Sequence, residues 1–225
     1  MYSRTALLIG DENVEIIKKS RVLIAGLGGV GGYVFEALAR AGVGTLGLCD
    51  FDVVDITNKN RQILALDSTV GKPKALVAEE RLKDINPDCE GMVFNFKIDE
   101  STLDELDIAS WDYVADCIDD VDAKTLLIRK SGEENVPIIS SMGTGNKLNS
   151  DDFKISKINQ TEYDRLARSM RRKTKDLGIN YEVLYSKESP VQDFIDTVPS
   201  ISYMPAAAGL RIAEHIIKKL IGVES

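Results

Sequence analysis

Several residues in the first 120 positions are of types that could bind and split a nucleotide. Residues 21–32, RVLIAGLGGVGG, form a glycine-rich segment, and carboxylates, cations and a second acidic segment follow it. Glycines let a backbone approach phosphates closely, and arginine or lysine stabilises the charge on a departing pyrophosphate. The residues that could do this chemistry are, in chain order, Gly26, Gly28, Gly29, Gly31, Asp50, Asp52, Asn58, Arg61, Lys72, Lys74 and Asp119.

The glycine segment by itself is compatible with a redox cofactor. Gly26, Gly28 and Gly31 satisfy the spacing G-x-G-x-x-G, which is typical of dinucleotide-binding turns. Asp50 ends the second expected strand, where a carboxylate commonly binds ribose hydroxyls. Other features of a dehydrogenase are missing, because the chain has no Tyr-x-x-x-Lys motif and its one histidine, His215, falls in the last expected helix. We expect a structural role for that histidine.

The residues that follow Asp50 favour phosphate cleavage instead. DFDVVDITNKNRQ (50–62) and VGKPKA (70–75) supply Asn58, Arg61, Lys72 and Lys74. Hydride transfer leaves a pyrophosphate intact and needs no such cluster, whereas phosphate cleavage does, because cations must stabilise the charge on the departing pyrophosphate. A solvated polar loop is the alternative for any one of these residues, but it explains the whole set less well.

The segment DCIDD (116–120) adds carboxylates just past an expected strand end. Asp119 could hold Mg²⁺ that bridges nucleotide phosphates. An acidic residue before a helix is also a common N-cap, so for this segment alone both interpretations stay open.

The elements that must position these residues alternate between strands and helices. We expect strands at 21–26, 45–50, 90–98, 111–118 and 136–141, and helices at 30–44, 72–85, 101–107 and 121–131. This alternation predicts an α/β, Rossmann-like, doubly wound and mostly parallel sheet. Ligands of such sheets lie beyond the carboxyl ends of the strands, so we expect Asp50, Asp116 and Asp119 to ring one crevice.

The pattern changes after residue 150. Strands are expected at 153–158 and 181–186, a basic helix at 161–177, an exposed loop at 188–200 and an amphipathic closing helix at 205–222. We therefore divide the chain into a nucleotide-binding domain (1–150) and a C-terminal extension (151–225) that packs on the same domain.

The composition argues against several classes of protein, and the distribution of charge singles out one basic segment. The net charge of −8 argues against an indiscriminate nucleic-acid binder, and we expect no DNA partner. RLARSMRRKTK (165–175) nevertheless holds six basic residues and no acid. The three cysteines show no paired spacing that would suit zinc. Because the N-terminus has no long apolar region and no apolar run could span a bilayer, we expect a cytoplasmic protein without a transmembrane segment.

Four motifs in one order carry a resemblance to a known family. GLGGVG, DFD with N-x-N-R-Q, G-K-P-K and D-C-I-D-D, within residues 1–145, resemble the ubiquitin-activating-enzyme-like, ThiF-type adenylyltransferase superfamily. The resemblance implies an enzyme that binds Mg-ATP, transfers AMP to a carboxylate and releases pyrophosphate. It assigns nucleotide binding to Gly26, Gly28, Gly29, Gly31, Asp50 and Asp52, phosphate contact to Asn58, Arg61 and Lys74, and the magnesium ion to Asp119. Arg4 resembles an arginine that reaches into the neighbouring subunit's ATP site, which implies a homodimer.

Stretches of the second half extend the resemblance over nearly the whole chain. IISSMGTGNKL (138–148), LARSMRR (166–172), YSKE (185–188) and SISYMPAAAGL (200–210) are similar to the tRNA threonylcarbamoyladenosine dehydratases. Such enzymes activate the threonyl carboxylate of a modified adenosine beside the anticodon, and the neighbouring carbamoyl group then displaces AMP and closes a ring. This is the leading hypothesis.

The cysteines bear on the nature of the substrate. Relatives that activate sulfur-carrier proteins often use cysteines after the ATP domain, whereas Cys49, Cys89 and Cys117 all precede residue 118, and we expect Cys49 and Cys117 to be buried and inert. A substrate that contains its own attacking group needs no covalent residue of the protein. Two alternatives stay open, namely an activator of a small sulfur-carrier protein that ends in Gly-Gly and a non-catalytic nucleotide-binding partner protein. A sulfur-relay or redox partner also stays open.

The basic segment fits an RNA substrate. A helix over these residues would place Arg165, Arg168, Arg172 and Lys175 on one face, where they could follow a phosphate backbone. With Arg171, these residues are the predicted tRNA contacts. An ordinary solvated helix face is the alternative.

Overall fold

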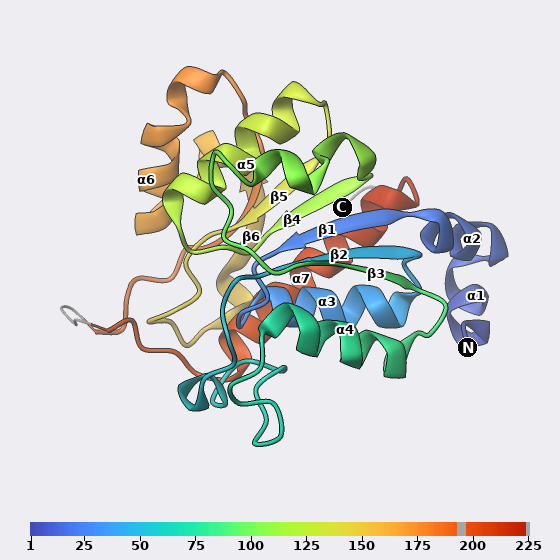
Figure 1. Ribbon diagram of the computed structural model, residues 1–225. Helices are drawn as coiled ribbons and strands as arrows, with labels where there is room; N and C mark the ends of the chain where they lie inside the picture. Colours follow the sequence, from blue (N-terminus) through green and yellow to red (C-terminus); the bar gives the residue numbers. More distant parts are fainter. Residues whose placement is uncertain (193–196, 224–225) are drawn as a thin grey trace.

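The computed structural model describes residues 1–192 and 197–223, and a seven-stranded sheet lies at its centre (Figure 1). The strand order is β3-β2-β1-β4-β5-β7-β6, and all neighbours pair in parallel except β6, which runs antiparallel to β7. The strands are β1 (Arg21–Ala25), β2 (Thr45–Cys49), β3 (Glu90–Phe94), β4 (Tyr113–Asp116), β5 (Ile138–Ser141), β6 (Phe153–Lys157) and β7 (Glu182–Ser186).

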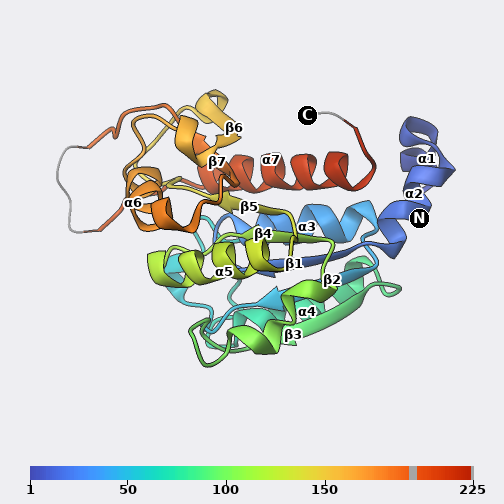
Figure 2. The same ribbon diagram turned by 90° about the horizontal axis from the view of Figure 1, so that it is seen from above.

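Helices cover both faces of this sheet, so the molecule has three layers (Figures 1 and 2). Helices α3 (Gly31–Ala41), α4 (Lys74–Ile85) and α7 (Tyr203–Leu220) lie on one face, and α5 (Val121–Glu133) and α6 (Arg165–Lys173) lie on the other. Helices α1 (Ser3–Ile9) and α2 (Asp11–Lys19) precede the first strand. Among the described residues, no helix has the length and apolar character needed to cross a membrane.

The apolar residues of the strands alternate between two cores. Val22 and Ile24 face the core under α3, α4 and α7, whereas Leu23 and Ala25 face the core under α5 and α6. Strands buried on both faces read as continuous apolar runs, which explains why RVLIA was recognisable as a strand. The predicted doubly wound, mostly parallel fold is confirmed, and strands from both sides of residue 150 belong to this one sheet.

Several predicted elements are shorter than expected. The strand expected at 90–98 ends at Phe94, after which the chain leaves the sheet. The helix expected at 101–107 is only a 3₁₀ turn over Leu103–Leu106. Here Asp99 accepts the N–H of Ser101 at 2.8 Å, and such local side-chain bonds compete with a regular helix. The loop expected at 188–200 contains no helix or strand in its described part, and residues 193–196 lie outside the described residues.

Topology fixes the position of the site. Strand β1 lies between β2 and β4, and the crossovers after β1 and β4 place α3 and α5 on opposite faces. A crevice forms at such a switch point, beyond the carboxyl ends of the strands.

Candidate active site

A cavity of about 600 Å³ opens at the carboxyl ends of β1, β2 and β4. Residues separated by almost a hundred positions meet there, because parallel strands end at the same edge of the sheet. Of the residues singled out from the sequence, those that line the cavity are Gly26, Gly28, Gly29, Asp50, Asp52, Asn58, Arg61, Lys74 and Asp119. Gly31 and Lys72 do not line it, and Lys72 lies on the exposed side, 3.9 Å from Glu80.

The glycine turn needs glycine for two different reasons. A Cβ atom at Gly31 would lie 1.7 Å from the carbonyl oxygen of Gly26, so Gly31 lets the turn close on itself. At Gly28, by contrast, the only described neighbour within 4 Å of a Cβ would be Gln62 Nε2 at 3.9 Å. Gly28 therefore keeps a cradle open in front of the N-terminus of α3, where backbone N–H groups favour an anion.

Asp50 braces the turn from the end of β2. Its Oδ2 accepts the N–H of Leu27 at 2.7 Å, and its Oδ1 accepts the N–H of Asp52 at 2.8 Å. Burial raises the pKa of Asp50 above its usual value. The charge of Lys74 and these two N–H donors lower the pKa, but they offset only part of the effect of burial. The carboxylate thus ties the glycine turn to the loop that carries the next polar residues.

Lys74 enters the crevice from the first residue of α4. Its Nζ lies 2.8 Å from Asp52 Oδ2, and its side chain is only 6% exposed whereas that of Asp52 is half exposed. The backbone N–H of Lys74 also donates to the carbonyl of Asp52 at 2.9 Å. A buried ammonium with one partly hydrated partner is well placed to attract a second anion.

Asn58 is the last residue of a capped 3₁₀ turn (Ile56–Asn58), and Arg61 lies in the turn that follows, where its backbone N–H donates to the carbonyl of Asn58 at 3.0 Å. Asp55 and Asn58 cap this turn reciprocally, since Asp55 accepts the N–H of Thr57 at 2.8 Å and Asn58 accepts that of Asp55 at 3.2 Å. Arg61 Nη1 donates to Asn60 Oδ1 at 2.9 Å. Nη1 also donates to the carbonyl of Thr57 at 3.3 Å, and in the described part of the chain no carboxylate lies within ion-pair distance of Arg61, which lines the crevice.

In the acidic segment DCIDD, Asp120 caps a helix and its neighbour Asp119 lines the crevice. Asp120 is the N-cap of α5 and accepts the N–H groups of Asp122 and Ala123 at 2.9 and 3.1 Å. Asp119 is exposed, lines the crevice and takes no part in this cap. The capping and ligand-binding interpretations of DCIDD are therefore compatible.

The prediction for Asp116 is wrong. Asp116 is fully buried, does not line the crevice, and pairs with Lys124 at 2.9 Å. Asp116 still belongs to the β4 ladder, where successive side chains alternate between faces. Like Val114, it points towards α5, while Asp119 lies far enough beyond the strand to reach the crevice.

Sequence reasoning missed other lining residues. Gln62 is 8% exposed, and its Oε1 has no hydrogen-bond partner among the described residues. Its place directly after Arg61 was the one available signal. Further parts of the wall come from segments that only the tertiary fold brings together, namely the loop residues Phe96, Lys97, Ile98, Thr144 and Ser200, and Pro205 in the first turn of α7.

The two cysteines of the crevice are unsuited to nucleophilic work. Cys49 ends β2 and Cys117 follows β4, and both line the cavity. Burial raises the pKa of each thiol to about 12. Neither is a thiolate at neutral pH, as expected from their apolar strand contexts.

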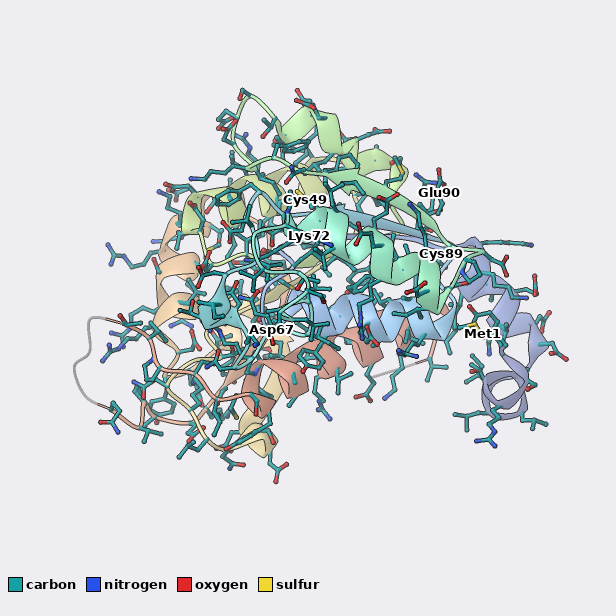
Figure 3. All side chains as sticks on the ribbon, turned by 60° about the horizontal axis from the view of Figure 1, so that its bottom comes forward. Met1, Cys49, Asp67, Lys72, Cys89 and Glu90 are labelled. Carbon is teal, nitrogen blue, oxygen red and sulfur yellow. The ribbon has the colours of Figure 1, made fainter. Side chains whose placement is uncertain are left out.

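Arg4 lies far from the crevice of its own chain. Figure 3 labels Met1 at the end of the sheet where β3 begins at Glu90, whereas Cys49 lies towards the other end of the sheet. Arg4 is an exposed residue of α1, next to that first end. Within one chain it cannot contact the residues of the crevice.

The basic helix is shorter and less uniform than predicted. Helix α6 ends at Lys173, so Lys175 lies in a following 3₁₀ turn and not on the same helical face. Arg171 turns inwards and donates to the carbonyl and hydroxyl of Thr161, and Lys173 pairs with Asp122 at 2.8 Å. Arg165, Arg168 and Arg172 are exposed and, among the described residues, have no ion-pair partner.

His215 has the structural position expected of it. It is buried within α7, and its Nε2 lies 2.9 Å from Glu182 Oε2. Both residues are absent from the lining of the crevice.

Residues 2–225 match the ThiF family. This chain belongs to the ThiF family. Its sequence is 38% identical to the tRNA threonylcarbamoyladenosine dehydratase of Bacillus subtilis, over 98% of this chain and 94% of that protein. The E. coli dehydratase, solved in complex with ATP, superposes with a TM-score of 0.92 at 30% identity, over 98% of this chain and 93% of that one.

Similarity to the molybdopterin-synthase adenylyltransferases covers less of this ThiF-family chain. The molybdopterin-synthase adenylyltransferase of Haemophilus influenzae is 40% identical, but over only 62% of this chain and 58% of that protein. Similarity to the dehydratases therefore extends over the second half as well, whereas similarity to this enzyme does not extend over the whole chain.

Proposed function

We propose that this protein is an ATP-dependent tRNA threonylcarbamoyladenosine dehydratase. One observation carries the proposal. This chain is similar to such enzymes over almost its whole length, and it brings a glycine turn, the side chains of Asn58, Arg61 and Lys74, and the exposed carboxylate of Asp119 into one crevice. The activation of a sulfur-carrier protein is the second candidate, and similarity over only part of the chain makes it the weaker one.

We propose one orientation for ATP in the crevice. The cradle at Gly28 would receive phosphates at the N-terminus of α3, and the ribose would lie near Asp50 at the end of β2. The base then extends towards β3, where Phe96 and Ile98 supply apolar surface. The opposite wall, with Thr144, is left for the carboxylate that is to be activated.

The cations of the crevice account for the first chemical step. A threonyl carboxylate oxygen attacks the α-phosphorus of ATP, and the bond to pyrophosphate breaks. Arg61 and Lys74 would stabilise the charge that develops on the departing pyrophosphate, and Asn58 would donate to it through its amide. Lys74 would exchange part of its contact with Asp52 for a phosphate oxygen.

Asp119 would hold Mg²⁺. In proteins this ion is commonly bound by one or two carboxylates together with substrate phosphates, and Asp119 is an exposed carboxylate at the crevice. When bound, Mg²⁺ would neutralise phosphate charge.

The second step needs no covalent residue of the protein. The carbamoyl group of the same nucleoside attacks the acyl carbon, AMP leaves with the former carboxylate oxygen, and the ring closes. Tethering makes this attack intramolecular, which raises the effective concentration of the attacking group. The high thiol pKa values of Cys49 and Cys117 fit a mechanism without an enzyme-bound acyl group.

We also propose a homodimer in which Arg4 of one chain completes the site of the other. Apolar side chains beside Arg4 are unusually exposed, with Leu7 at 89% and Leu8 at 85%. Two apolar side chains that line the crevice are exposed as well, with Phe51 at 54% and Val53 at 53%. Exposed apolar patches of this kind suit a protein–protein contact.

The tRNA would bind across α6. Arg165, Arg168 and Arg172 are exposed cations, and the N-cap of α6, Asp164, lies beside Gly143, one residue from Thr144 of the crevice wall. A phosphate backbone on this helix would therefore lie near the crevice mouth. Because tRNA is the proposed substrate, we expect the protein to act in the cytoplasm.

Isotope exchange between pyrophosphate and ATP tests the proposed function. We expect exchange with Mg-ATP only when tRNA carrying threonylcarbamoyladenosine is present. The control is the same tRNA without the modification. Exchange that depends instead on a small protein ending in Gly-Gly would replace the proposal with the second candidate, and a folded, ATP-bound protein inactive with both would be a non-catalytic binder.

A further inference from the structure

A fully buried lysine lies beneath the crevice without lining it. Lys124, in the first part of α5, donates to Asp116 Oδ2 at 2.9 Å, to Ser140 Oγ at 3.0 Å and to the carbonyl of Ser141 at 2.9 Å. An ammonium group has three donors, and all three are used. Lys124 thereby joins the end of β4, the end of β5 and helix α5.

Asp116 links Lys124 by hydrogen bonds to the turn that contains Asp119. Its Oδ2 also accepts the hydroxyl of Ser140 at 2.5 Å, and its Oδ1 accepts the N–H of Ile118 at 3.2 Å. Ile118 directly precedes Asp119. The same turn touches the glycine turn, because a Cβ at Gly26 would lie 2.8 Å from the carbonyl oxygen of Cys117.

The second arm of the cluster leads to the opposite wall. Ser140 and Ser141 end β5, and the chain continues through Met142 and Gly143 to Thr144, which lines the crevice. Lys124 is thus bonded to the strand ends from which two separate parts of the crevice emerge.

Stability is a poor reason for such a cluster. Lys124 and Asp116 are both 0% exposed, and the cost of removing two charges from water can exceed their attraction. Replacement of a buried ion pair by apolar residues of similar size is often neutral or stabilising. What a buried ion pair with so many hydrogen bonds does provide is one fixed arrangement of three chain segments.

We propose that Lys124, acting through Asp116 and Ser140, is a positioning residue for Asp119 and for the Thr144 wall. It sets the turn after β4 against the glycine turn, so that the Asp119 carboxylate faces the place where phosphates bind. This inference rests on the proposed function only in that Asp119 is taken to hold Mg²⁺.

The test is a double variant that separates stability from positioning. Lys124→Met with Asp116→Leu removes both buried charges together, so neither is left unpaired, and we expect a folded variant whose melting temperature falls only by the hydrogen bonds that Ser140, Ser141 and Ile118 lose. The readout is calorimetric binding of ATP with Mg²⁺ and with EDTA. We expect the advantage that Mg²⁺ gives to ATP binding to fall by about tenfold or more, as when the support of a metal ligand is removed. Dehydratase turnover should fall in parallel.

Two further variants calibrate the result. Asp119→Asn defines the loss of the Mg²⁺ effect when the carboxylate itself is gone. Lys130→Met is the control, because it removes ion pairs of α5 with Glu134 and Asp104 that lie away from the crevice, and it should leave Mg²⁺ dependence unchanged.

A folded double variant with the parent's Mg²⁺ dependence would overturn the proposal. If the double variant does not fold, Ser140→Ala carries the test, since it keeps the ion pair and removes only the bridging hydroxyl. Mg²⁺ dependence that stays unchanged in folded Ser140→Ala would then overturn it. Failure of the proposed function is distinguishable, because the parent would show no turnover with modified tRNA while the binding measurements would still report on Asp119.

Discussion

The crevice and the basic surface of helix α6 were both predicted from clusters of charged residues, but only in the crevice do the predicted side chains lie together. In the crevice, residues from Gly26 to Asp119 converge on one cavity. On α6, the cations of one short segment diverge, because Arg171 turns towards Thr161 and Lys173 pairs with Asp122. Charges at the ends of parallel strands are placed by the sheet, whereas a run of charges on one helix is placed only by its own periodicity.

The largest expected effect concerns the crevice. Lys74→Met should lower the rate of AMP formation about 10²–10³-fold, as expected when one interaction with the transition state is removed. Lys72→Met is the matched control, since Lys72 lies two residues away but outside the cavity, and its rate should stay near that of the parent. The rates are measured with modified tRNA. Equal rates for the two variants would contradict the prediction that Lys74 in the crevice contributes to the reaction and Lys72 on the surface does not.

The next largest effect concerns the proposed contribution of Arg4 to the crevice of the partner chain. Arg4→Ala and Lys74→Met should each be inactive alone, yet their mixture should regain activity, because a mixed dimer has one crevice with both residues intact. Turnover of the mixture after subunit exchange is the measurement. If Arg4 acted within its own chain, every crevice in the mixture would lack one residue and no activity would return.

A smaller effect is expected on α6. Arg168→Glu with Arg172→Glu should weaken tRNA binding and reduce the slope of log affinity against log salt by about 2, one for each phosphate that these arginines would otherwise neutralise. ATP binding should stay unchanged, because neither residue lines the crevice. An unaltered salt slope would mean that α6 is an ordinary solvated face.

The smallest effect lies away from both regions. Glu36 on α3 accepts hydrogen bonds from Arg81 Nε at 2.7 Å and Arg40 Nε at 2.8 Å. Burial opposes ionisation, but these two arginines hold the pKa of Glu36 below its usual value. Because the folded-state pKa is the lower one, the stabilisation is present above the unfolded-state pKa and is lost as the pH falls through the folded-state value.

Glu36→Gln should therefore lower the free energy of unfolding by about 1 kcal/mol at neutral pH, the upper range for a partly exposed ion pair. Urea unfolding of parent and variant between neutral pH and pH values below the usual glutamate pKa checks this. The difference should vanish in acid; a difference that persists there would assign the effect to packing instead of charge.

The fold and most of the crevice were predictable because each depends on local sequence that the sheet then organises. The apolar run RVLIA, the glycine turn and Asp50 after TLGLC mark strand ends, and parallel strands bring their ends together. Residues that follow a strand by a few positions, such as Asp119, were placed well. Asp116 was placed wrongly, because successive side chains of a strand point to opposite faces of the sheet and a shift of one position changes the face.

The rest of the site was not predictable because tertiary packing alone creates it. Lys124 looks like any other lysine of an amphipathic helix, yet Ser140 and Asp116 surround it only in the folded chain. Thr144 and Ser200 reach the crevice from loops with no nucleotide motif of their own. The end of α6 at Lys173 was likewise invisible in a sequence that stays basic to Lys175.

The mass of the modified nucleoside tests the central claim most directly. The protein is incubated with Mg-ATP and tRNA that carries threonylcarbamoyladenosine, and the digested nucleosides are analysed by mass spectrometry. The account predicts a nucleoside lighter by the mass of one water molecule, formed with one AMP per conversion. An unchanged nucleoside mass, with the protein folded and ATP bound, would contradict it.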